Sequence, residues 1–284
     1  MLTRRRLLAL VSPVVLAAGC AAPTGTTLER ARRSGVLRIG ISGERPYSYV
    51  GGDGAVTGAQ PEVARAVLAR MGIDGLEAVQ VRFAELIPGL RAGLFDLVAA
   101  GTTVTPQRCA DVAFTRPDFV APPAFLVPDG NPRGIGTFQG VQRSGVTLAV
   151  LDGSAELGYA RGAGIPDDRL ALADSQGDLF GDVVGGRAQA GALTAISLAD
   201  ELRRNPGSGV EITRPVEPTV EGRTVVPAAA FAVRLGEADL LAAFDAGLTA
   251  IQASGEWAQL TQPFGLTADN LPTPDLTTAE LCER

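Results

Sequence analysis

A predicted strand end, a short turn and a helix start lie together between Gly93 and Phe119. Thr105 followed by Pro106 has the residue types that open helices, a hydroxyl N-cap and a proline at the first helical position. The free amides of a first helical turn attract anions, and Arg108 stands in that turn. A guanidinium can hold a carboxylate through two parallel hydrogen bonds. We therefore expect Arg108 to clamp a small carboxylate beside the turn that begins at Gly101.

Other side chains that could touch the same ligand follow the ends of other predicted strands. Glu44 and Tyr47 stand in the loop after a strand at 36–41, and Phe83 ends a strand at 79–83. In doubly wound sheets, ligands bind beyond the carboxyl ends of the strands, so these residues are expected to share one site. Two further polar residues follow strands later in the chain, Ser154 and Thr194.

Each of these residues also has a simpler structural interpretation. Arg108 could be a solvated helix residue that pairs with Asp111. Glu44 could form a surface ion pair with Arg45, which would contribute little to stability. The two aromatic residues could belong to the core, and the two hydroxyl residues could only be helix N-caps.

The elements that would carry these residues form two groups along the chain. Within each group, strands and helices alternate, which is typical of a doubly wound parallel α/β sheet. The first group has expected strands at 36–41, 79–83 and 95–100 and expected helices at 61–71 and 85–92. The second group has expected strands at 147–151, 170–173 and 188–193 and expected helices beginning at 155, 176 and 195.

Two extended runs, at 119–127 and 225–233, connect the two groups. Prolines make the first run stiff and unlike a core strand. Two α/β lobes joined by two crossings form a hinge architecture, with a cleft between the strand ends of both lobes. We expect lobe 1 to contain residues 36–122 and 231–284, and lobe 2 to contain residues 128–226.

Composition narrows the chemistry of the cleft. The chain has 284 residues and a formal net charge of −6, and it contains no histidine. Histidine is the usual proton shuttle and the commonest metal ligand, so we expect neither a metal site nor a cofactor. An acidic chain without a basic patch also argues against nucleic-acid binding.

The first 19 residues have the features of a bacterial export signal. Three arginines at positions 4–6 precede a short apolar run from Leu7 to Ala18, which is too short to span a membrane stably. The run leads to Cys20 through a sequence that resembles the lipobox of bacterial lipoproteins, which implies lipidation of Cys20. We expect residues 1–19 to be a removed signal peptide and residues 20–35 to be a tether.

The lipidated protein would be exported and held on the outer face of the cytoplasmic membrane. Loss of the three leader arginines would leave a net charge of −9. The arginine cluster also resembles a twin-arginine signal, so export in the folded state is possible. An ordinary secretory signal and an uncleaved anchor remain as alternatives.

Two more cysteines, Cys109 and Cys282, remain after Cys20 is assigned to the lipid. Export permits a disulfide, which would pin the C-terminal tail to the helix that carries Arg108. The alternative is a pair of free thiols, one buried and one near a frayed chain end.

Several motifs resemble the polar amino-acid-binding proteins of bacterial ABC importers, over nearly the whole mature chain. The general motifs are Glu44-x-Pro-Tyr, LIPGL at 86–90, Gly93-x-Phe-Asp and Gly101-x-x-x-Thr-x-x-Arg. More specific segments, among them PEVARAVLARMG and TPQRCADVAF, resemble the ectoine/hydroxyectoine-binding subfamily.

In that subfamily, a compact zwitterion lies in an aromatic cage, with an arginine on its carboxylate and an acidic side chain near its amidine. The resemblance implies these roles for Arg108 and Glu44, and cage positions for Tyr47 and Phe83. The third cage position falls at Thr103, where the subfamily usually has an aromatic residue. Losing a cation–π contact of up to about 2 kcal/mol would weaken binding about tenfold or redirect it to another ligand. Two lobe-2 positions that usually touch ligand hold Ser154 and Thr194.

The resemblance implies a two-lobed type II periplasmic-binding-protein fold and a receptor function. Such a receptor would bind a small zwitterion between its lobes as a monomer and deliver it to an ABC permease and its ATPase. One alternative is a cyclohexadienyl or arogenate dehydratase on the same fold, with Glu44 as general acid or base. The absence of histidine and lysine argues against this enzyme. A second alternative is a receptor that signals to a sensor kinase.

Overall fold

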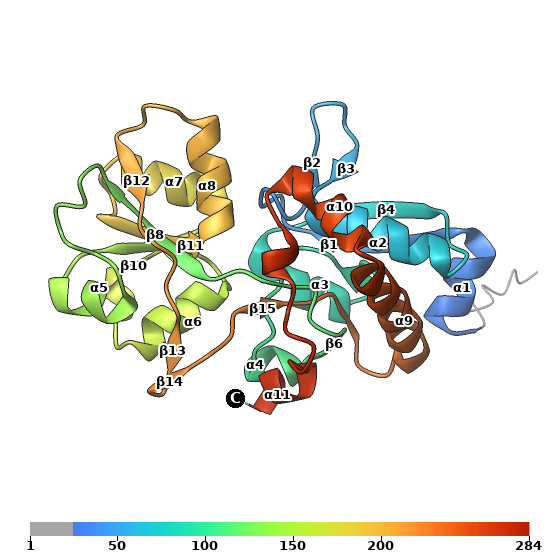
Figure 1. The fold of residues 1–284 in the computed structure, drawn as a ribbon. Coiled ribbons are helices and arrows are strands. Elements are labelled where there is room, and N and C mark those ends of the chain that lie inside the picture. Colours follow the sequence, from blue (N-terminus) through green and yellow to red (C-terminus); the bar gives the residue numbers. More distant parts are fainter. Residues whose placement is uncertain (1–24, 284) are drawn as a thin grey trace, which may run out of the picture.

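The structure is a computed structural model that describes residues 25–283 and shows two α/β lobes side by side (Figure 1). The predicted signal peptide at 1–19 and the predicted lipidation site, Cys20, lie outside the described residues. Within the described part of the chain, no helix is both long and apolar enough to cross a membrane.

Lobe 1 is built on a five-stranded sheet in the order β4-β1-β5-β16-β6. β1 runs parallel to β4 and β5, whereas β16, from late in the chain, runs antiparallel to β5 and β6. The strands are β1 Val36–Ile41, β4 Gly75–Gln80, β5 Leu97–Val98, β6 Val112–Phe114 and β16 Ala232–Arg234, with a small hairpin of β2 Tyr49–Val50 and β3 Val56–Thr57. The helices are α1 Thr27–Ser34, α2 Ala59–Arg70, α3 Leu86–Arg91, α4 Pro106–Cys109, α9 Ala238–Ser254, α10 Glu256–Thr261 and α11 Thr278–Glu283.

Lobe 2 is built on a second five-stranded sheet, in the order β10-β9-β11-β8-β12. β9 runs parallel to β10 and β11, and β8 runs antiparallel to β11 and β12. The strands are β8 Pro123–Pro128, β9 Leu148–Leu151, β10 Leu170–Ala173, β11 Ala190–Thr194 and β12 Val210–Ile212, with a hairpin of β13 Thr219–Val220 and β14 Arg223–Thr224. The helices are α5 Phe138–Ser144, α6 Ala155–Gly162, α7 Gln176–Val184 and α8 Ala195–Arg204.

The two crossings pair with each other between the lobes. β7 Phe119–Val120 lies antiparallel to β15 Ala228–Ala229, and these short strands form a two-stranded ribbon. The interpretation of 119–127 as a crossing unlike a core strand is wrong for its second half. Residues from Pro123 onward form β8, a buried strand with a partner on each side. Pro122 and Pro123 are tolerated because they stand before and at the first residue of β8, where a missing N–H removes no bond from the strand interior.

Several predicted boundaries in lobe 1 also need correction. The strand expected at 79–83 is β4, Gly75–Gln80. It pairs with β1 along its whole length, and it ends at Gln80 because β1 ends opposite that residue. Phe83 therefore opens a single 3₁₀ turn instead of ending a strand. The strand expected at 95–100 is paired only over β5, Leu97–Val98. The predicted helix start is confirmed, because Thr105 caps α4 through its side chain, although α4 is only one turn long.

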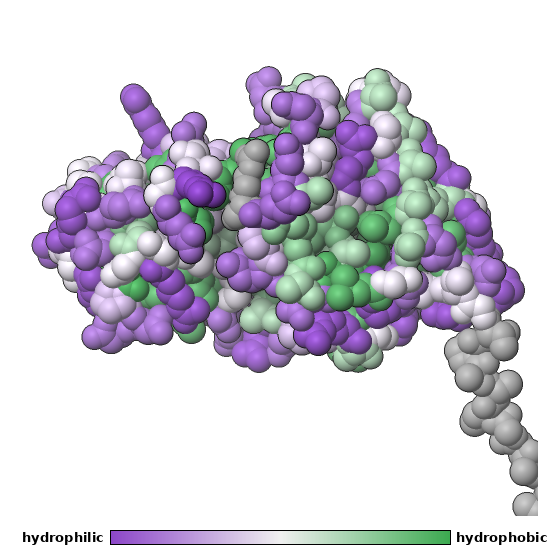
Figure 2. Space-filling model, turned by 90° about the horizontal axis from the view of Figure 1, so that it is seen from below, coloured by the Kyte–Doolittle hydropathy of each residue, from purple (hydrophilic) through white to green (hydrophobic). Residues whose placement is uncertain are grey.

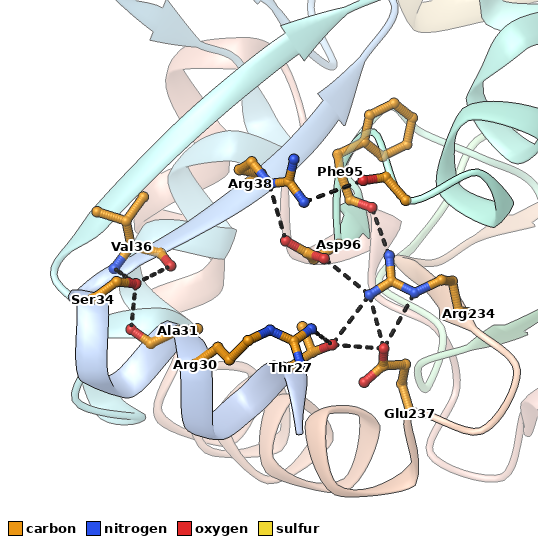
Figure 3. A network of polar contacts seen from close by, with 11 residues as sticks. Thr27, Arg30, Ala31, Ser34, Val36, Arg38, Phe95, Asp96, Arg234 and Glu237 are labelled. Atoms are coloured by element: carbon orange, nitrogen blue, oxygen red, sulfur yellow. Dashed lines mark hydrogen bonds and ion pairs between the residues drawn. The ribbon is translucent and has the colours of Figure 1, made fainter. Parts of the chain in front are cut away.

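The N-terminal helix α1 belongs to lobe 1, so the tether predicted at 20–35 is too long. Leu28 and Ala31 are buried in the lobe 1 core. Figure 3 shows the polar network beside this helix, in which the Arg234 guanidinium donates to Thr27, Asp96 and Glu237. Because one face of α1 is buried and Thr27 is hydrogen-bonded to Arg234, α1 is a folded part of lobe 1 and not a flexible tether.

The predicted disulfide is confirmed, and it joins Cys109 in α4 to Cys282 in α11 across 173 residues of sequence. In Figure 1, α11 lies against α4 at the bottom of the molecule. The bond therefore fixes the C-terminal helix beside the helix that carries Arg108. Leu281 is buried next to it, in the cluster that also holds Phe95 and Val104.

A buried polar cluster ties the last helices to the lobe 1 core. Trp257 is fully buried, and its indole N–H donates to Asp118 Oδ1 at 2.7 Å. The Gln60 side-chain amide donates to Asp118 Oδ2 at 3.1 Å. Burial raises the pKa of Asp118 to about 6, and the two donated hydrogen bonds oppose that rise.

We expect Asp118→Ala to lower the free energy of unfolding by about 1–3 kcal/mol, because two buried donors would lose their acceptor. Equilibrium denaturation in urea at pH 7 would measure the change. Asp118→Asn keeps one acceptor oxygen and should fall between the wild type and the alanine variant. An alanine variant as stable as the wild type would contradict the importance of this cluster.

Candidate functional site

The two lobes are in direct contact, and the predicted site residues lie at the contact. The Tyr47 hydroxyl of lobe 1 donates to Thr194 Oγ1 of lobe 2 at 2.8 Å. The Ser197 hydroxyl of lobe 2 donates to Glu44 Oε1 of lobe 1 at 2.5 Å. Glu44 and Tyr47 are both buried. The structure therefore shows a closed arrangement of the lobes.

Two further contacts close the cleft around this pair. Gln176 of lobe 2 accepts from the Arg45 backbone N–H at 3.1 Å and donates to the Arg45 carbonyl at 3.0 Å. Arg82 of lobe 1 contacts Asp174 of lobe 2 at 3.0 Å, where both side chains are exposed. Because an exposed ion pair contributes little, we assign the stability of the closed arrangement mainly to the buried and partly buried hydrogen bonds.

Arg108 also bridges the lobes. Its guanidinium donates to the Thr103 carbonyl of lobe 1 at 2.6 Å and to the Gly153 carbonyl of lobe 2 at 2.7 Å. Its Cζ atom lies 5.5 Å from the centre of the Phe83 ring. Two of its five N–H donors are used in these bonds, so the rest can serve a ligand.

The turn after β5 positions the residues around Arg108. Gly101 has a positive φ of 67°, and a side chain there would meet the Tyr47 ring at 2.9 Å. Gly101 therefore lets the turn pack against Tyr47, whose ring stacks on Phe119 with centres 5.1 Å apart. Thr103 forms an antiparallel bridge with Ala229 of the return crossing. Its demonstrated contact with Arg108 is through its backbone carbonyl.

Ser154 and Thr194 are both helix N-caps, as their simpler interpretation proposed. The Ser154 hydroxyl accepts from the Leu157 N–H at 3.2 Å at the start of α6. The Thr194 hydroxyl accepts from the Ser197 N–H at 3.3 Å at the start of α8. Thr194 therefore has two roles, because it caps α8 and its hydroxyl also accepts from Tyr47 of the other lobe.

Sequence analysis missed Glu156, a buried carboxylate in the first turn of α6. Burial raises the pKa of Glu156, and the nearby Arg108 charge opposes the rise. Burial also lowers the pKa of Arg108, while Glu156 and Tyr159 act in the other direction. The position of Glu156 in the sequence could have revealed it, because it lies two residues after Ser154, in the segment that follows β9. It was missed because only the strand-end residue itself was considered.

Two cavities flank the contact between Arg108 and Gly153. The smaller one, of about 60 Å³, lies beside Phe83, Thr102 and Arg108. The Thr102 hydroxyl is buried and has no hydrogen-bond partner among the described residues. A buried hydroxyl without a partner is unfavourable, so this cavity suits a polar group of a ligand. The larger cavity, of about 370 Å³, lies on the α4–α6 side of Arg108.

The pKa of Glu44 links closure to pH. This pKa is raised from an ordinary 4.5 to about 8, mainly by burial and to a smaller extent by the Glu156 charge, while the Ser197 hydrogen bond opposes the rise. Exposure in an open form would return it toward the ordinary value. A carboxyl whose pKa is raised by closure favours closure fully below pH 4.5, and this contribution is lost as pH rises through 8.

We therefore expect the ligand-free protein to be more closed at pH 5 than at pH 8.5. Small-angle X-ray scattering would detect this as a smaller radius of gyration at the lower pH. Glu44→Gln removes the titrating group and should reduce the difference, with a remainder from Glu156. An equal pH response in the variant would show that Glu44 does not control closure.

Within residues 25–283, no group of three or more His, Cys, Asp or Glu side chains is arranged to hold a metal ion. Besides the exposed pair of Arg82 and Asp174, the lobe contact holds the charged side chains of Glu44, Glu156 and Arg108. Together they can bind a ligand that carries both charges.

Comparison with known proteins agrees with this geometry. Residues 37–267 match the family of bacterial extracellular solute-binding proteins, family 3. The chain belongs to this family. It is a solute receptor that acts outside the cytoplasm, and membership implies a small ligand and a membrane permease as partners. The two-lobed periplasmic-binding fold expected from the sequence is confirmed.

Individual relatives of this family 3 receptor cover nearly all of its length. It is 32% identical over 260 residues to a probable amino-acid ABC transporter periplasmic-binding protein of Sinorhizobium fredii, covering 90% of this chain and 86% of the relative. The crystal structure of EhuB in complex with hydroxyectoine is 32% identical, with a TM-score of 0.83 over 90% of this chain and 97% of EhuB. An ancestral amino acid-binding protein, a precursor of cyclohexadienyl dehydratase, is 25% identical, with a TM-score of 0.72 over 84% and 99% of the chains.

Proposed function

We propose that this receptor captures a small zwitterion between its lobes and delivers it to the permease of an ABC importer. Arg108 holds the ligand carboxylate, and Glu44 and Glu156 face its cationic end. The observation that carries this proposal is the placement of Arg108, which contacts a carbonyl of each lobe beside the buried Glu156 carboxylate. A ligand bound there touches both lobes, so binding shifts the population toward closure.

The charges at the lobe contact favour a ligand with a strong cationic centre. With both carboxylates ionised, Glu44, Glu156 and Arg108 sum to one negative charge, which a cation would balance. A cation beside Glu44 would lower the pKa of that carboxyl from its value of about 8. Ectoine and hydroxyectoine, with a carboxylate and an amidinium, satisfy these requirements, and the likeness to the hydroxyectoine complex of EhuB supports them. Polar amino acids satisfy them as well.

The roles proposed for the remaining residues follow from their positions. Tyr47 and Phe83 form apolar walls on either side of the turn at Gly101 and Thr103. Ser154 and Thr194 present the capped starts of α6 and α8 to the ligand. Thr103 leaves the cage without its third aromatic residue, so we expect ectoine to bind more weakly here than in a complete cage.

Export and anchoring complete the proposal. Cleavage before Cys20 and its lipidation would hold the receptor, as a monomer, on the outer face of the cytoplasmic membrane. The acidic composition supports a role without nucleic acid. A receptor that signals to a sensor kinase would use the same cleft, and a permease gene beside this one would favour transport.

We propose a binding protein rather than an enzyme. One observation favours the enzyme alternative, because the buried Glu44 carboxyl has a pKa of about 8 and could supply a proton at neutral pH. The likeness to a dehydratase precursor points the same way. Incubation with prephenate and arogenate, followed by detection of the aromatic products, would decide between the two functions. Turnover lost in Glu44→Gln would overturn the proposal.

Isothermal titration calorimetry tests the receptor function. The panel is ectoine, hydroxyectoine, proline, glycine betaine, glutamine and arginine. We expect saturable binding of at least one zwitterion, with loss of that binding in Glu44→Gln plus Glu156→Gln. Binding of an amino acid without ectoine would retain the receptor and exclude the ectoine assignment. Absence of binding to the whole panel would reject a zwitterion receptor of this type.

A further inference from the structure

The larger cavity, called here the α4–α6 cavity, lies between the lobes on the opposite side of Arg108 from Phe83 and Thr102. Its volume of about 370 Å³ falls in the range of about 300–1,000 Å³ that is typical of small-molecule sites. Neither Glu44 nor Tyr47 lines it. It is therefore separate from the cage positions implied by the resemblance.

The walls of this cavity are mainly apolar and come from four parts of the chain. Val104 and Pro106 come from the start of α4, and Leu157 and Tyr159 come from α6. The remaining apolar walls come from the lobe 2 hairpin with the residues after it, and from α11: Val220, Val225, Val226 and Leu281. Figure 2 shows the molecule from this side, with hydrophobic residues visible between the hydrophilic surfaces of the two lobes.

The charged residues among the lining are both arginines. Arg108 lies at the inner end, and Arg161 is exposed and pairs with Asp167 at 2.9 Å. No carboxylate is among the lining residues. Apolar walls beside a cationic inner end match a ligand with a carboxylate and a hydrophobic body.

We propose that the α4–α6 cavity is a subsite for a hydrophobic substituent of the ligand whose carboxylate is held by Arg108. This inference rests on the receptor function proposed above and specifies the ligand class as an amphipathic zwitterion larger than ectoine. The carboxylate accepts from the Arg108 donors that the Thr103 and Gly153 carbonyls leave free, and the hydrophobic substituent enters between α4 and α6. The polar end stays on the side of Glu44 and Glu156.

Gly158 gives a direct way to fill the cavity. It is exposed on α6 and lines the cavity, and a Cβ atom added there would meet no atom within 4 Å. Its backbone is helical, so a larger residue is compatible with the helix. Gly162, four residues later on the same helix, is equally exposed and open but does not line the cavity. Gly158→Trp and Gly162→Trp therefore form a matched pair.

The experiment measures glycine, leucine and phenylalanine binding to the full mature chain by calorimetry. We expect wild-type affinity to rise along this series, by about fourfold for each methylene that becomes buried. Gly158→Trp should reduce the affinity for phenylalanine to about that for glycine, and Gly162→Trp should leave all three affinities unchanged. Equal affinities along the series, or an unaffected Gly158→Trp variant, would overturn the subsite.

Failure of the proposed function would look different. If glycine, leucine, phenylalanine and every member of the calorimetry panel fail to bind, the zwitterion receptor is rejected, and the cavity is tested with 3-phenylpropanoate, a carboxylate without a cationic end. Saturable binding of this probe that is lost in Gly158→Trp and kept in Gly162→Trp would support the subsite alone. Absence of binding would overturn the subsite too.

Discussion

Replacing Arg108 with alanine should reduce the affinity for the ligand at least about 30-fold. Truncating one partner of a buried, hydrogen-bonded charge pair typically costs 2–5 kcal/mol, much of it because the other charge is left unpaired. Here that other charge is the ligand carboxylate. The variant also loses the two backbone contacts of Arg108 to Thr103 and Gly153, so the closed form itself is weakened.

Calorimetry with the best ligand of the panel would measure the loss, and a thermal melt would show whether the fold is retained. Arg91→Ala is the matched control, because Arg91 is an exposed lobe 1 arginine that pairs with Asp111 at 2.7 Å. It should change affinity less than twofold. Arg108→Lys keeps the charge and loses the planar pair of donors, so it should recover only part of the affinity. Full affinity in Arg108→Ala would place the carboxylate elsewhere.

Removing the disulfide should lower the free energy of unfolding by about 2–5 kcal/mol. A bond that closes a long loop restricts the unfolded chain strongly, and Cys109 and Cys282 are separated by 173 residues. For a chain of this size, such a loss corresponds to a fall in Tm of about 5–15 °C. The double variant Cys109→Ser plus Cys282→Ser would show this in differential scanning calorimetry.

The wild type measured with a thiol reductant provides the control, and its Tm should approach that of the double variant. Leu281 next to the bond lines the α4–α6 cavity. We therefore also expect the double variant to lose affinity for phenylalanine more than for glycine. A Tm that neither reductant nor substitution changes would show that α11 is held by packing alone.

Sequence reasoning succeeded where local signals mark both ends of an element. The helix expected from 195 is α8, and it starts where Thr194 provides a side-chain cap. The long helix α9 ends at Gly255, which adopts the left-handed conformation that terminates helices. Periodicity and capping are properties of neighbouring residues, so they can be read without the fold.

Errors appeared where distant residues decide the structure. β8 is a core strand because β11 and β12 pair with its two edges, and the prolines at its start suggested otherwise. The cage position of Thr103 stays a prediction, and the structure shows its carbonyl accepting from Arg108 and its backbone pairing with Ala229.

The central part of the candidate site was only partly predictable for the same reason. Arg108, Glu44, Tyr47 and Thr194 were expected at strand ends, and the structure brings them to the lobe contact. Glu156 and Ser197 are both buried, and Ser197 reaches Glu44 because lobe 2 is closed over lobe 1. A hydrogen bond between the lobes joins residues far apart in the sequence, so it leaves no local signal.

The return of the chain to lobe 1 makes lobe 2 one uninterrupted segment, from β8 to the residues just before β15. Lobe 1 holds both described chain ends, in α1 and α11. Lobe 2 is thus encoded by one continuous stretch of the gene. Exchanging that stretch would replace Glu156, Thr194 and Ser197 together while leaving Arg108 and Glu44 in place. A fold built this way lets one recombination event alter half of the binding surface without disturbing the other half.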